Sequence, residues 1–406
     1  MKECRNAVPA AVFTFDASSR RTLSRSLNSG VENGHWTLHF LKKAVLSAPI
    51  RGHPGNVGLD LGGTAMHQIL NISKNSVPRY GLVLLLVALG SQAAAGKPVY
   101  TAFDPPGSTS TFPGNINDSG AITGWYDDSN SQIHGFVRAV DGTITSFDPP
   151  GSTGTYPYGI NRKGVIAGYY ADSNNITHGF ARAADGTITS FDPPGSTNTI
   201  VYDNNDKGAI TGYYADTNGM NHGFVRNAQG SFTVFDPPGS TGTLASGINK
   251  ADAVTGWYFD SSGVSHGFIR TASGVFTTFD VAGDSGINPF VINSEGATTG
   301  VYFVNNEDPY GAFVRAADGT IAIIDPPGST YTYAFGINNK GVVTGDYSDG
   351  GDDVHSYIRS ADGAIKSFDP PGATNSISYG INDKGSIVGG FYLPNDTTFH
   401  GFVRSR

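Results

Sequence analysis

Residues 178–195 read HGFARAADGTITSFDPPG, and close copies of this stretch recur at a fixed interval along most of the chain. Its FDPPG segment, or a near variant, begins at Phe103, Phe147, Phe191, Phe235, Phe279, Ile324 and Phe368. Successive copies are 44 residues apart, except for one spacing of 45. A constant period in this range is typical of folds that repeat one supersecondary unit. The chain therefore contains seven tandem units, and the structure of one unit should decide the fold.

Each unit is expected to form four strands joined by tight turns. Thr, Tyr, Phe, Val and Ile dominate the segments between Gly, Asn, Asp and Pro, which is typical of strands and turns. In the second unit the strands are predicted over residues 155–160, 165–170, 178–183 and 187–192. Asp185-Gly186 predicts a two-residue hairpin turn between the third and fourth strands. Pro193-Pro194-Gly195 ends the fourth strand, because proline cannot donate to a strand ladder.

The predicted hairpin turn sets the register between the third and fourth strands. A two-residue turn at Asp141-Gly142 places Phe136 opposite Phe147. The same rule pairs Phe180 with Phe191, Phe224 with Phe235, Phe268 with Phe279, Phe313 with Ile324, and Tyr357 with Phe368. Large apolar pairs at matching positions would stabilise each hairpin and fix its register.

The two ends of the repeat region complement each other. Residues 99–104 resemble a fourth strand with no third strand before it, and residues 402–406 end a unit that lacks its fourth strand. Pairing these ends would place Phe103 opposite Phe402, whereas a linear solenoid would need capping units. The sequence therefore predicts an all-β fold: a seven-bladed β-propeller of four-stranded antiparallel blades, closed by pairing of the N-terminal strand with the C-terminal blade.

The repeat also resembles a known group, the bacterial extracellular HAF repeats, named after a His-Ala-Phe motif. The resemblance depends on Gly159 to Gly164, Gly168 and His178 to Phe180, and it covers residues 100–406. This chain has Gly in place of the Ala, except at Gly311-Ala312-Phe313, and it adds the FDPPGST segment. The resemblance implies an exported protein of β-propeller type and supplies no catalytic residues.

A signal sequence is predicted ahead of the repeats. Residues 80–89 form an apolar run of ten, preceded by Lys74 and Arg79 and followed by an Ala-rich end. This pattern is typical of a secretory signal peptide, and the run is too short for a stable membrane anchor. We expect a signal peptide over 66–95 that is cleaved after Ala95. Translation would then start at Met66, and residues 1–65 would come from a start codon assigned too far upstream. The alternative is a true 65-residue extension with an uncleaved anchor.

Charge and cysteine content restrict the partners of the region over 96–406. Residues 1–95 hold 10 basic and 4 acidic side chains of the 26 and 34 in the chain, which leaves a net charge of −14 after residue 95. An acidic surface should repel nucleic acid and anionic membranes. Cys4 is the only cysteine, so no disulfide or thiolate metal site is expected after residue 95. A secreted monomer, extracellular or periplasmic, that binds a glycan or a protein fits this composition.

Several polar positions repeat in nearly every unit and are interpreted as structural. A catalytic residue is needed only once, whereas a scaffold residue is needed in each copy. The repeated histidines are His134, His178, His222, His266, His355 and His400. The other three sets are Asn117, Asn161, Asn205, Asn249, Asn293, Asn338 and Asn382; Asp104, Asp148, Asp192, Asp236, Asp280, Asp325 and Asp369; and Arg138, Arg182, Arg226, Arg270, Arg315, Arg359 and Arg404.

Each set has a predicted contact. His134 should lie beside Asp148, and its counterparts beside theirs. Asn and Asp should accept hydrogen bonds from turn backbone groups. Arg should hold carbonyls or carboxylates of a neighbouring blade.

Ligand-binding residues are expected on the first strands and in the unit that departs from the pattern. The first strands should lie nearest the channel, and they supply Tyr156, Tyr158, Tyr202, Tyr331, Tyr333 and Tyr379. The irregular unit supplies Asn305, Glu307 and Asp308. Asp-rich loops over 127–130, 172–175 and 216–219 make Ca²⁺ possible, but none has the full EF-hand spacing, and ordinary turns are the favoured interpretation. No cofactor is otherwise expected.

The sequence favours a binding or scaffold module over an enzyme. It contains no P-loop, Gly-x-Ser-x-Gly, His-Glu-x-x-His or paired-cysteine motif. A glycan is the first expected ligand, because aromatic rings stack on sugars. The alternative is a secreted hydrolase or lyase with a site at the channel mouth.

Overall fold

A computed structural model describes residues 97–304, 311–351 and 353–405. By its internal contacts the chain divides into Met1–Val87 and Ala88–Arg406, and every described residue belongs to the second region. The predicted signal peptide over 66–95 and the extension over 1–65 therefore lie outside the described residues. Among the residues described, no helix is long and apolar enough to cross a membrane.

The described part of the chain consists of β-strands that fall into groups of four. The first strands of the groups are β2 (Ser108–Ile116), β6 (Gly154–Ile160), β10 (Asn198–Asn204), β14 (Gly242–Ile248), β18 (Gly286–Ile292), β22 (Tyr331–Ile337) and β26 (Asn375–Ile381). The second strands are β3 (Ile122–Asp128), β7 (Ile166–Ala171), β11 (Ile210–Ala215), β15 (Val254–Phe259), β19 (Thr298–Phe303), β23 (Val343–Ser348) and β27 (Ile387–Tyr392).

The outer two strands of each group are shorter on average. The third strands are β4 (Ile133–Arg138), β8 (Thr177–Arg182), β12 (Asn221–Arg226), β16 (Ser265–Arg270), β20 (Gly311–Arg315), β24 (Val354–Arg359) and β28 (His400–Ser405). The fourth strands are β5 (Ile144–Phe147), β9 (Ile188–Phe191), β13 (Phe232–Phe235), β17 (Phe276–Phe279), β21 (Ile321–Ile324), β25 (Ile365–Phe368) and β1 (Val99–Phe103). The predicted all-β fold of tandem four-stranded antiparallel units is confirmed.

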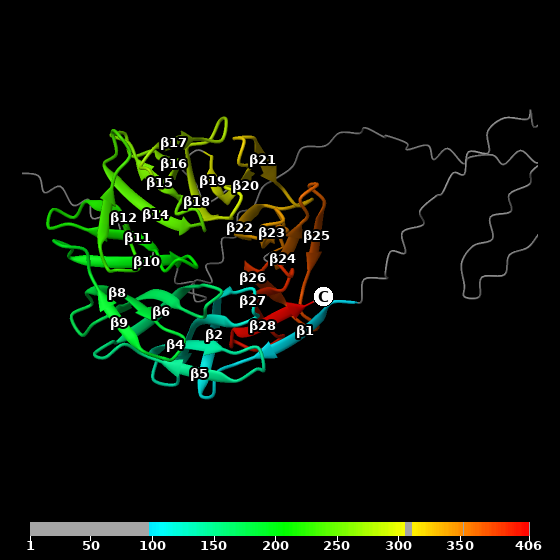
Figure 1. Cartoon of the computed structure of the whole chain (residues 1–406). Helices are drawn as coiled ribbons and strands as arrows, with labels where there is room; N and C mark the ends of the chain where they lie inside the picture. Colours follow the sequence, from blue (N-terminus) through cyan, green and yellow to red (C-terminus); the bar gives the residue numbers. More distant parts are fainter. Residues whose placement is uncertain (1–96, 305–310, 352, 406) are drawn as a thin grey trace, which may run out of the picture. The chain divides into compact units, whose positions relative to one another are not determined.

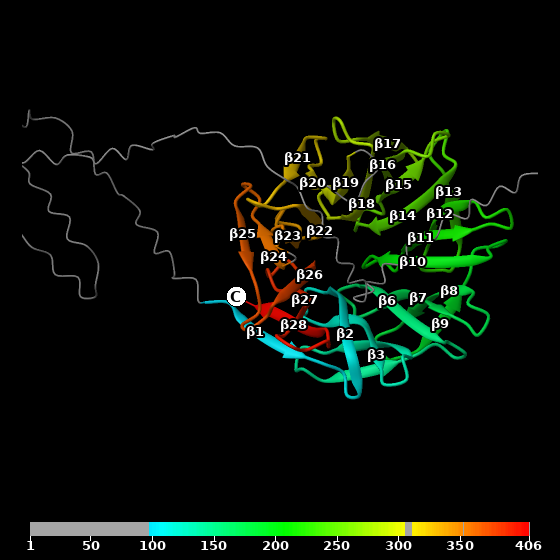
Figure 2. The ribbon, with the colours of Figure 1, turned by 180° about the vertical axis from the view of Figure 1, so that it is seen from behind.

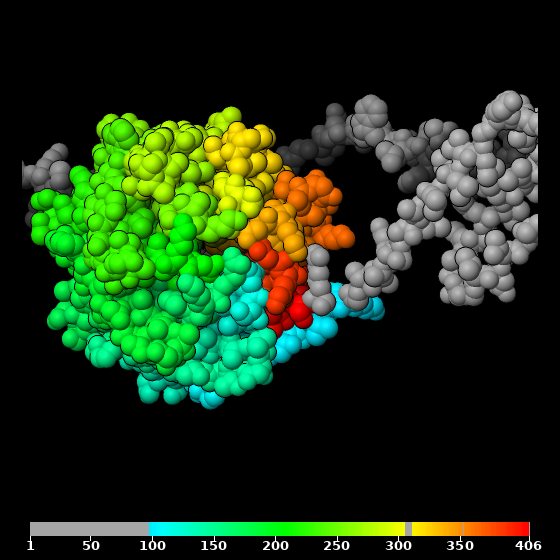
Figure 3. Space-filling model, in the orientation of Figure 1, coloured from blue at the N-terminus to red at the C-terminus, as the bar shows by residue number. Residues whose placement is uncertain are grey.

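The groups are arranged about a common centre, with the first strand of each group nearest to it (Figures 1 and 2). Five groups are separate four-stranded sheets, and the groups β2–β5 and β6–β9 are joined through one parallel residue pair, Ile133 with Gly154. The sheet order β1-β28-β27-β26 brings the first described strand beside the last. Their pairing is antiparallel, from Val99 with Ser405 to Phe103 with Gly401. Figure 3 shows the same cyan and red segments in contact.

The predicted register between the third and fourth strands is wrong by one residue. In the first group Phe147 lies opposite Gly135, and Phe136 lies opposite Ser146. The turn has three residues, because Ala139 N donates to Thr143 O and Gly142, at a φ of 93°, donates to Ala139 O. This is a type I turn followed by a left-handed glycine, a common alternative to the two-residue turn. The same shift places Ala102, and not Phe103, opposite Phe402.

The corrected register places the two phenylalanines of each hairpin on opposite faces of the sheet. One ring covers the glycine of His-Gly-Phe: a Cβ at Gly179 would lie 2.5 Å from the Phe191 ring. The fourth-strand ring then contacts the third-strand ring of the next group. Such edge-to-face pairs, with centroids 6.0–6.4 Å apart, are Phe103–Phe136, Phe147–Phe180, Phe235–Phe268, Phe279–Phe313 and Phe368–Phe402. The aromatic pairs therefore join neighbouring groups instead of strands of one hairpin.

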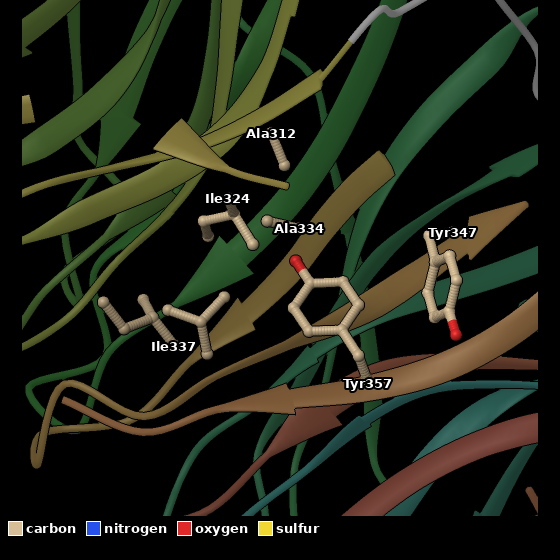
Figure 4. Close-up of a cluster of buried hydrophobic side chains, with 7 residues drawn as sticks. Ala312, Ile324, Ala334, Ile337, Tyr347 and Tyr357 are labelled. Carbon is tan, nitrogen blue, oxygen red and sulfur yellow. The ribbon is translucent and has the colours of Figure 1, made fainter. Parts of the chain in front are cut away.

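The hydrophobic core is divided into clusters that fill the spaces between adjacent groups. The cluster shown in Figure 4 combines Ala312 and Ile324 of one group with Ala334, Ile337 and Tyr357 of the next. Ile324 and Tyr357 are fully buried. Side chains from two groups therefore make one apolar layer, which explains why a single 44-residue unit would not be expected to fold alone.

Six of the seven repeated arginines contact aromatic rings, and not the carbonyls or carboxylates of a neighbouring group as predicted. For the seventh, Arg359, the corresponding residue of the preceding group is Ile324, which has no ring. Arg182 of β8 lies over the ring of Phe147 in the preceding group, at 4.8 Å from its centroid. Arg182 Nη1 also donates to Ala183 O beside it, at 3.4 Å. Arg138, Arg226, Arg270, Arg315 and Arg404 make the same contact at 4.6–5.1 Å. These are cation–π contacts between groups, and they cover the edges of the core clusters.

The repeated asparagines link the groups in series. The Asn117 side-chain amide donates to Asn161 O, and Asn161 donates in turn to Asn205 O, at 2.9 and 3.0 Å. The series continues through Asn249, Asn293, Asn338 and Asn382, whose amide donates to Asn117 O. As predicted, each side-chain oxygen also accepts turn backbone N–H groups, for example those of Ala251 and Ala253 on Asn249. All seven residues are at most 6% exposed.

We expect Asn249→Ala to lower the free energy of unfolding by about 2–4 kcal/mol, because it leaves buried backbone groups without partners. Urea unfolding followed by circular dichroism measures this change. The matched control is Asn174→Ala, in an exposed loop, which should change stability by no more than about 0.5 kcal/mol. Equal effects of the two substitutions would show that the inter-group amide is dispensable.

Candidate functional site

A β-bulge in every first strand inserts one extra residue into the strand nearest the centre. In β6 the register shifts between Pro157 and Gly159, so Tyr158 is the extra residue. The seven bulge residues are Gly114, Tyr158, Tyr202, Ser246, Phe290, Phe335 and Tyr379. The second strand needs glycine opposite the bulge, because a Cβ at Gly168 would lie 2.2 Å from Tyr156 O. Bulges commonly re-aim side chains in this way, and here five of the seven are aromatic.

Aromatic side chains of the first and second strands, together with Phe399 from the loop between β27 and β28, form two chains of ring contacts. The first, called the first arc, consists of Phe399, Phe112, Trp125, Tyr156, Tyr158, Tyr169, Tyr202 and Tyr213. Trp125 lies 5.3 Å from Tyr158 and stacks on Phe112 at 5.8 Å. Most of these rings, including Phe112, Trp125, Tyr156 and Tyr158, keep part of their surface exposed.

The second arc consists of Trp257, Phe290, Phe335, Tyr333, Tyr331 and Tyr379. Phe335 stacks on Phe290 at 5.8 Å and on Tyr333 at 5.3 Å. All six side chains are partly exposed. The inner strands therefore present aromatic faces, and not only aromatic core, to whatever occupies the centre.

The two arcs approach each other, and burial raises the pKa of several of their tyrosines. Burial raises the pKa of Tyr379 strongly, and the charges of Asp346, Tyr392 and Tyr158 raise it further. Tyr379 of the second arc thus lies within electrostatic range of Tyr158 of the first. Burial likewise raises the pKa of Tyr158 to about 12. Neutral phenols supply both a donor and an acceptor, which suits the recognition of hydroxyl groups.

The structure brings the predicted ligand residues into this lining. Tyr156, Tyr158 and Tyr202 belong to the first arc, and Tyr331, Tyr333 and Tyr379 belong to the second. Asn305, Glu307 and Asp308 lie outside the described residues. The first strands were expected nearest the centre, and Figure 1 shows them there.

The repeated histidines lie away from the centre on the third strands. Nδ1 of each histidine is 2.7–3.0 Å from the predicted fourth-strand aspartate, as in His134 with Asp148. Nε2 is 3.1–3.8 Å from a loop aspartate. The fourth-strand aspartate also accepts from the next first strand, as Asp192 does from Thr199 at 2.6 Å. The network therefore connects three strands and two groups, which fits the structural interpretation.

The Asp-rich loops use their oxygens to close turns. Asp172 Oδ1 accepts from the backbone N–H groups of Asn174 and Ile176, at 2.8 and 2.9 Å. These hydrogen bonds lower the pKa of Asp172. Asp128, Asp216 and Asp260 make equivalent pairs of contacts. Over the described ranges, no group of three or more His, Cys, Asp or Glu side chains is placed to hold a metal ion.

Sequence reasoning missed two carboxyl groups in the inner lining. Asp203 follows the bulge of β10, where four other units have glycine, and Asp346 lies in β23, where the first four units have Trp or Tyr. Burial raises the pKa of Asp203 to about 7. Hydrogen bonds from the Ile248 and Asn204 N–H groups lower this pKa, but burial has the larger effect. Both residues occur once in seven units. A search for single departures from the repeat, position by position, would have found them.

Comparison with known proteins supports the fold and assigns no family. No protein-family model matches the chain, and no curated protein sequence matches it. Virginiamycin B lyase from Staphylococcus aureus is similar in structure, with a TM-score of 0.53 and 14% identity, over 76% of this chain and 100% of that one. The β-propeller domain of the Trilobed protease from Pyrococcus furiosus is also similar, with a TM-score of 0.52 and 11% identity, over 72% of this chain and 95% of that one. At these identities the likeness shows a β-propeller fold alone.

The histidine network should make stability depend on pH. Burial tends to lower the pKa of His400, but its hydrogen bonds and charge interactions with Asp104 and Asp396 outweigh it and raise the pKa above 6.5. A raised pKa stabilises the fold fully below 6.5, and the stabilisation is lost as pH rises through the folded-state pKa. We expect the stability advantage of the wild type over His400→Gln to be larger at about pH 5.5 than at about pH 8.

Thermal unfolding across this pH range measures the difference. The control Gln229→Ala, at an exposed turn without a nearby histidine, should follow the wild type at every pH. An advantage over His400→Gln that grows with pH would contradict the assignment.

Proposed function

We propose that residues 96–406 form a closed seven-bladed β-propeller that acts outside the cell as a glycan-binding module. Closure is supported by the antiparallel pairing of β1 with β28. It is supported independently by the asparagine series, in which Asn382 donates to Asn117 O across 265 residues of sequence. In a closed ring every group packs between two neighbours, so no end unit needs a cap.

Glycan binding is proposed from one observation, the partly exposed aromatic faces of the two arcs. Sugar rings present C–H groups that pack on aromatic faces, and their hydroxyls suit neutral phenols. Trp125 and Tyr156, from adjacent groups, meet edge to face with their centroids 6.0 Å apart, so the pair offers two ring faces at an angle to each other. Burial and the charge of Asp128 raise the pKa of Asp127, which adds a carboxyl group within electrostatic range of Tyr156.

Export is proposed from the sequence alone. The basic flank, the apolar run over 80–89 and the Ala-rich end before residue 96 support a cleaved signal peptide. The resemblance to extracellular HAF repeats also supports export. A net charge of −14 after residue 95 fits a soluble exported monomer that does not bind nucleic acid.

A glycan array followed by calorimetry tests the binding proposal. For the best ligand we expect Trp125→Ala and Tyr156→Ala each to weaken binding about tenfold, because each removes a stacking face. Val140→Ala changes a side chain that is 73% exposed in a turn between third and fourth strands, and it should leave affinity unchanged. If the wild type retained no glycan, or the two ring variants bound as well as it does, the proposal would be abandoned.

A secreted hydrolase or lyase is the second candidate, and Asp203 is the observation that favours it. Burial raises the pKa of its carboxyl group to about 7, which would let it exchange protons near neutral pH. Glycosidases usually need a second carboxyl group at a defined separation. Both oxygens of Asp203 accept backbone N–H groups, which also suits a fixed structural role.

Product analysis on bound glycans separates the two candidates. We expect no release of shortened or unsaturated sugars by the wild type, and Asp203→Asn should bind glycan within about twofold of it. Turnover that changes around pH 7 and disappears in Asp203→Asn would support the enzyme instead.

A further inference from the structure

Asp346 is a buried carboxyl group whose position calls for an explanation. It is 3% exposed, and its Oδ1 atom has no hydrogen-bond partner in the described part of the chain. Its cross-strand neighbour on β22 is Tyr333. The equivalent positions of the first four units are Trp125, Tyr169, Tyr213 and Trp257, and the next unit has Val301. An apolar side chain therefore satisfies the fold at this position, and the carboxylate is not required for packing.

Several tyrosines lie near this carboxyl group. Tyr331 lies two residues before Tyr333 on the same face of β22, and Tyr379 of β26 lies within electrostatic range of Asp346. The charge of Asp346 contributes to the raised pKa of Tyr331, Tyr379 and Tyr357, after burial in each case. Tyr357 already donates its hydroxyl to Tyr333 O at 2.9 Å. Tyr331, Tyr333 and Tyr379 are partly exposed and form the accessible side of the cluster.

A buried carboxylate oxygen without a hydrogen-bond partner destabilises a fold. Either protonation of the carboxyl group or pairing with a cation reduces this cost. Burial raises its pKa well above the usual value, so it remains protonated without a ligand. Alternatively, a cationic donor can pair with the carboxylate in a charge-assisted hydrogen bond. Aromatic faces around the carboxylate attract the same cation. The chemistry of the cluster thus selects a positively charged hydrogen-bond donor.

We propose that Asp346, Tyr331, Tyr333 and Tyr379 form a subsite for the ammonium group of an amino sugar. The inference rests on the proposed glycan binding and adds the class of sugar. Tyr331 and Tyr333 would contact the sugar ring, and Asp346 would accept hydrogen bonds from its ammonium group. N-acetylation removes that charge and adds bulk, so the free amine is the preferred form. The acidic surface of the region after residue 95 would also attract such a ligand.

Calorimetry at about pH 6 with three β-1,4-linked tetrasaccharides tests the subsite. The probes are the tetramers of glucosamine, N-acetylglucosamine and glucose, which differ only at the second carbon of each sugar. We expect the wild type to bind the glucosamine tetramer about tenfold more tightly than either of the others, because only it offers a charged donor. Asp346→Asn should reduce this preference to about twofold or less.

The control is Asp141→Asn, which removes a carboxylate from an exposed turn between third and fourth strands. It should retain the preference, which excludes a general attraction between an acidic protein and a cationic sugar. The wild-type comparison alone overturns the subsite if the glucose tetramer binds as tightly as the glucosamine tetramer, even if the variant does not fold. Binding of neutral glycans without a preference would reject the subsite and leave the proposed function standing. Absence of binding by any glycan would reject both.

Discussion

The side-chain amide of one asparagine in each unit is the interaction on which the arrangement depends. Its oxygen closes the turn between the first and second strands, and its nitrogen donates to the matching asparagine carbonyl of the next group. One buried residue therefore fixes the local turn and the position of the neighbouring group together. The series returns from Asn382 to Asn117, so a distortion in one group is resisted by both neighbours. Because the amides are buried, losing one leaves polar groups that water cannot reach.

Other inter-group contacts follow from this spacing. The phenylalanine of a fourth strand fits against the next group because glycine in His-Gly-Phe leaves room for the ring. The arginine at the end of a third strand then lies over the phenylalanine of the preceding group. Each group thus contributes half of a core cluster, half of an aromatic pair and half of a cation–π contact. Each group packs against a neighbour on both sides, so the same contact residues are needed in every unit. This explains why the sequence repeats.

Function is expected where the repetition fails. The bulge positions and their neighbours vary between aromatic, small and acidic residues, whereas the asparagine, aspartate and arginine positions are constant. A bulge residue has no partner in the strand ladder, so these positions can vary at little cost to the fold. Asp203 and Asp346 are the two strongest departures. Burial raises the pKa of both carboxyl groups, and Asp346 lies within electrostatic range of Tyr331 and Tyr379.

The sequence by itself determined the strands, their grouping in fours, the histidine–aspartate contacts and the tyrosines of the inner strands. Each of these depends on periodic spacing, which is visible without coordinates. Tertiary structure alone decided the hairpin register, because an Asp-Gly pair is compatible with turns of two or three residues. It also decided that arginine contacts a ring, that Asp346 Oδ1 is buried without a hydrogen-bond partner in the described part of the chain, and that Asp203 is buried. Those outcomes depend on side chains from neighbouring groups, and no spacing within a single unit specifies how closely two groups pack.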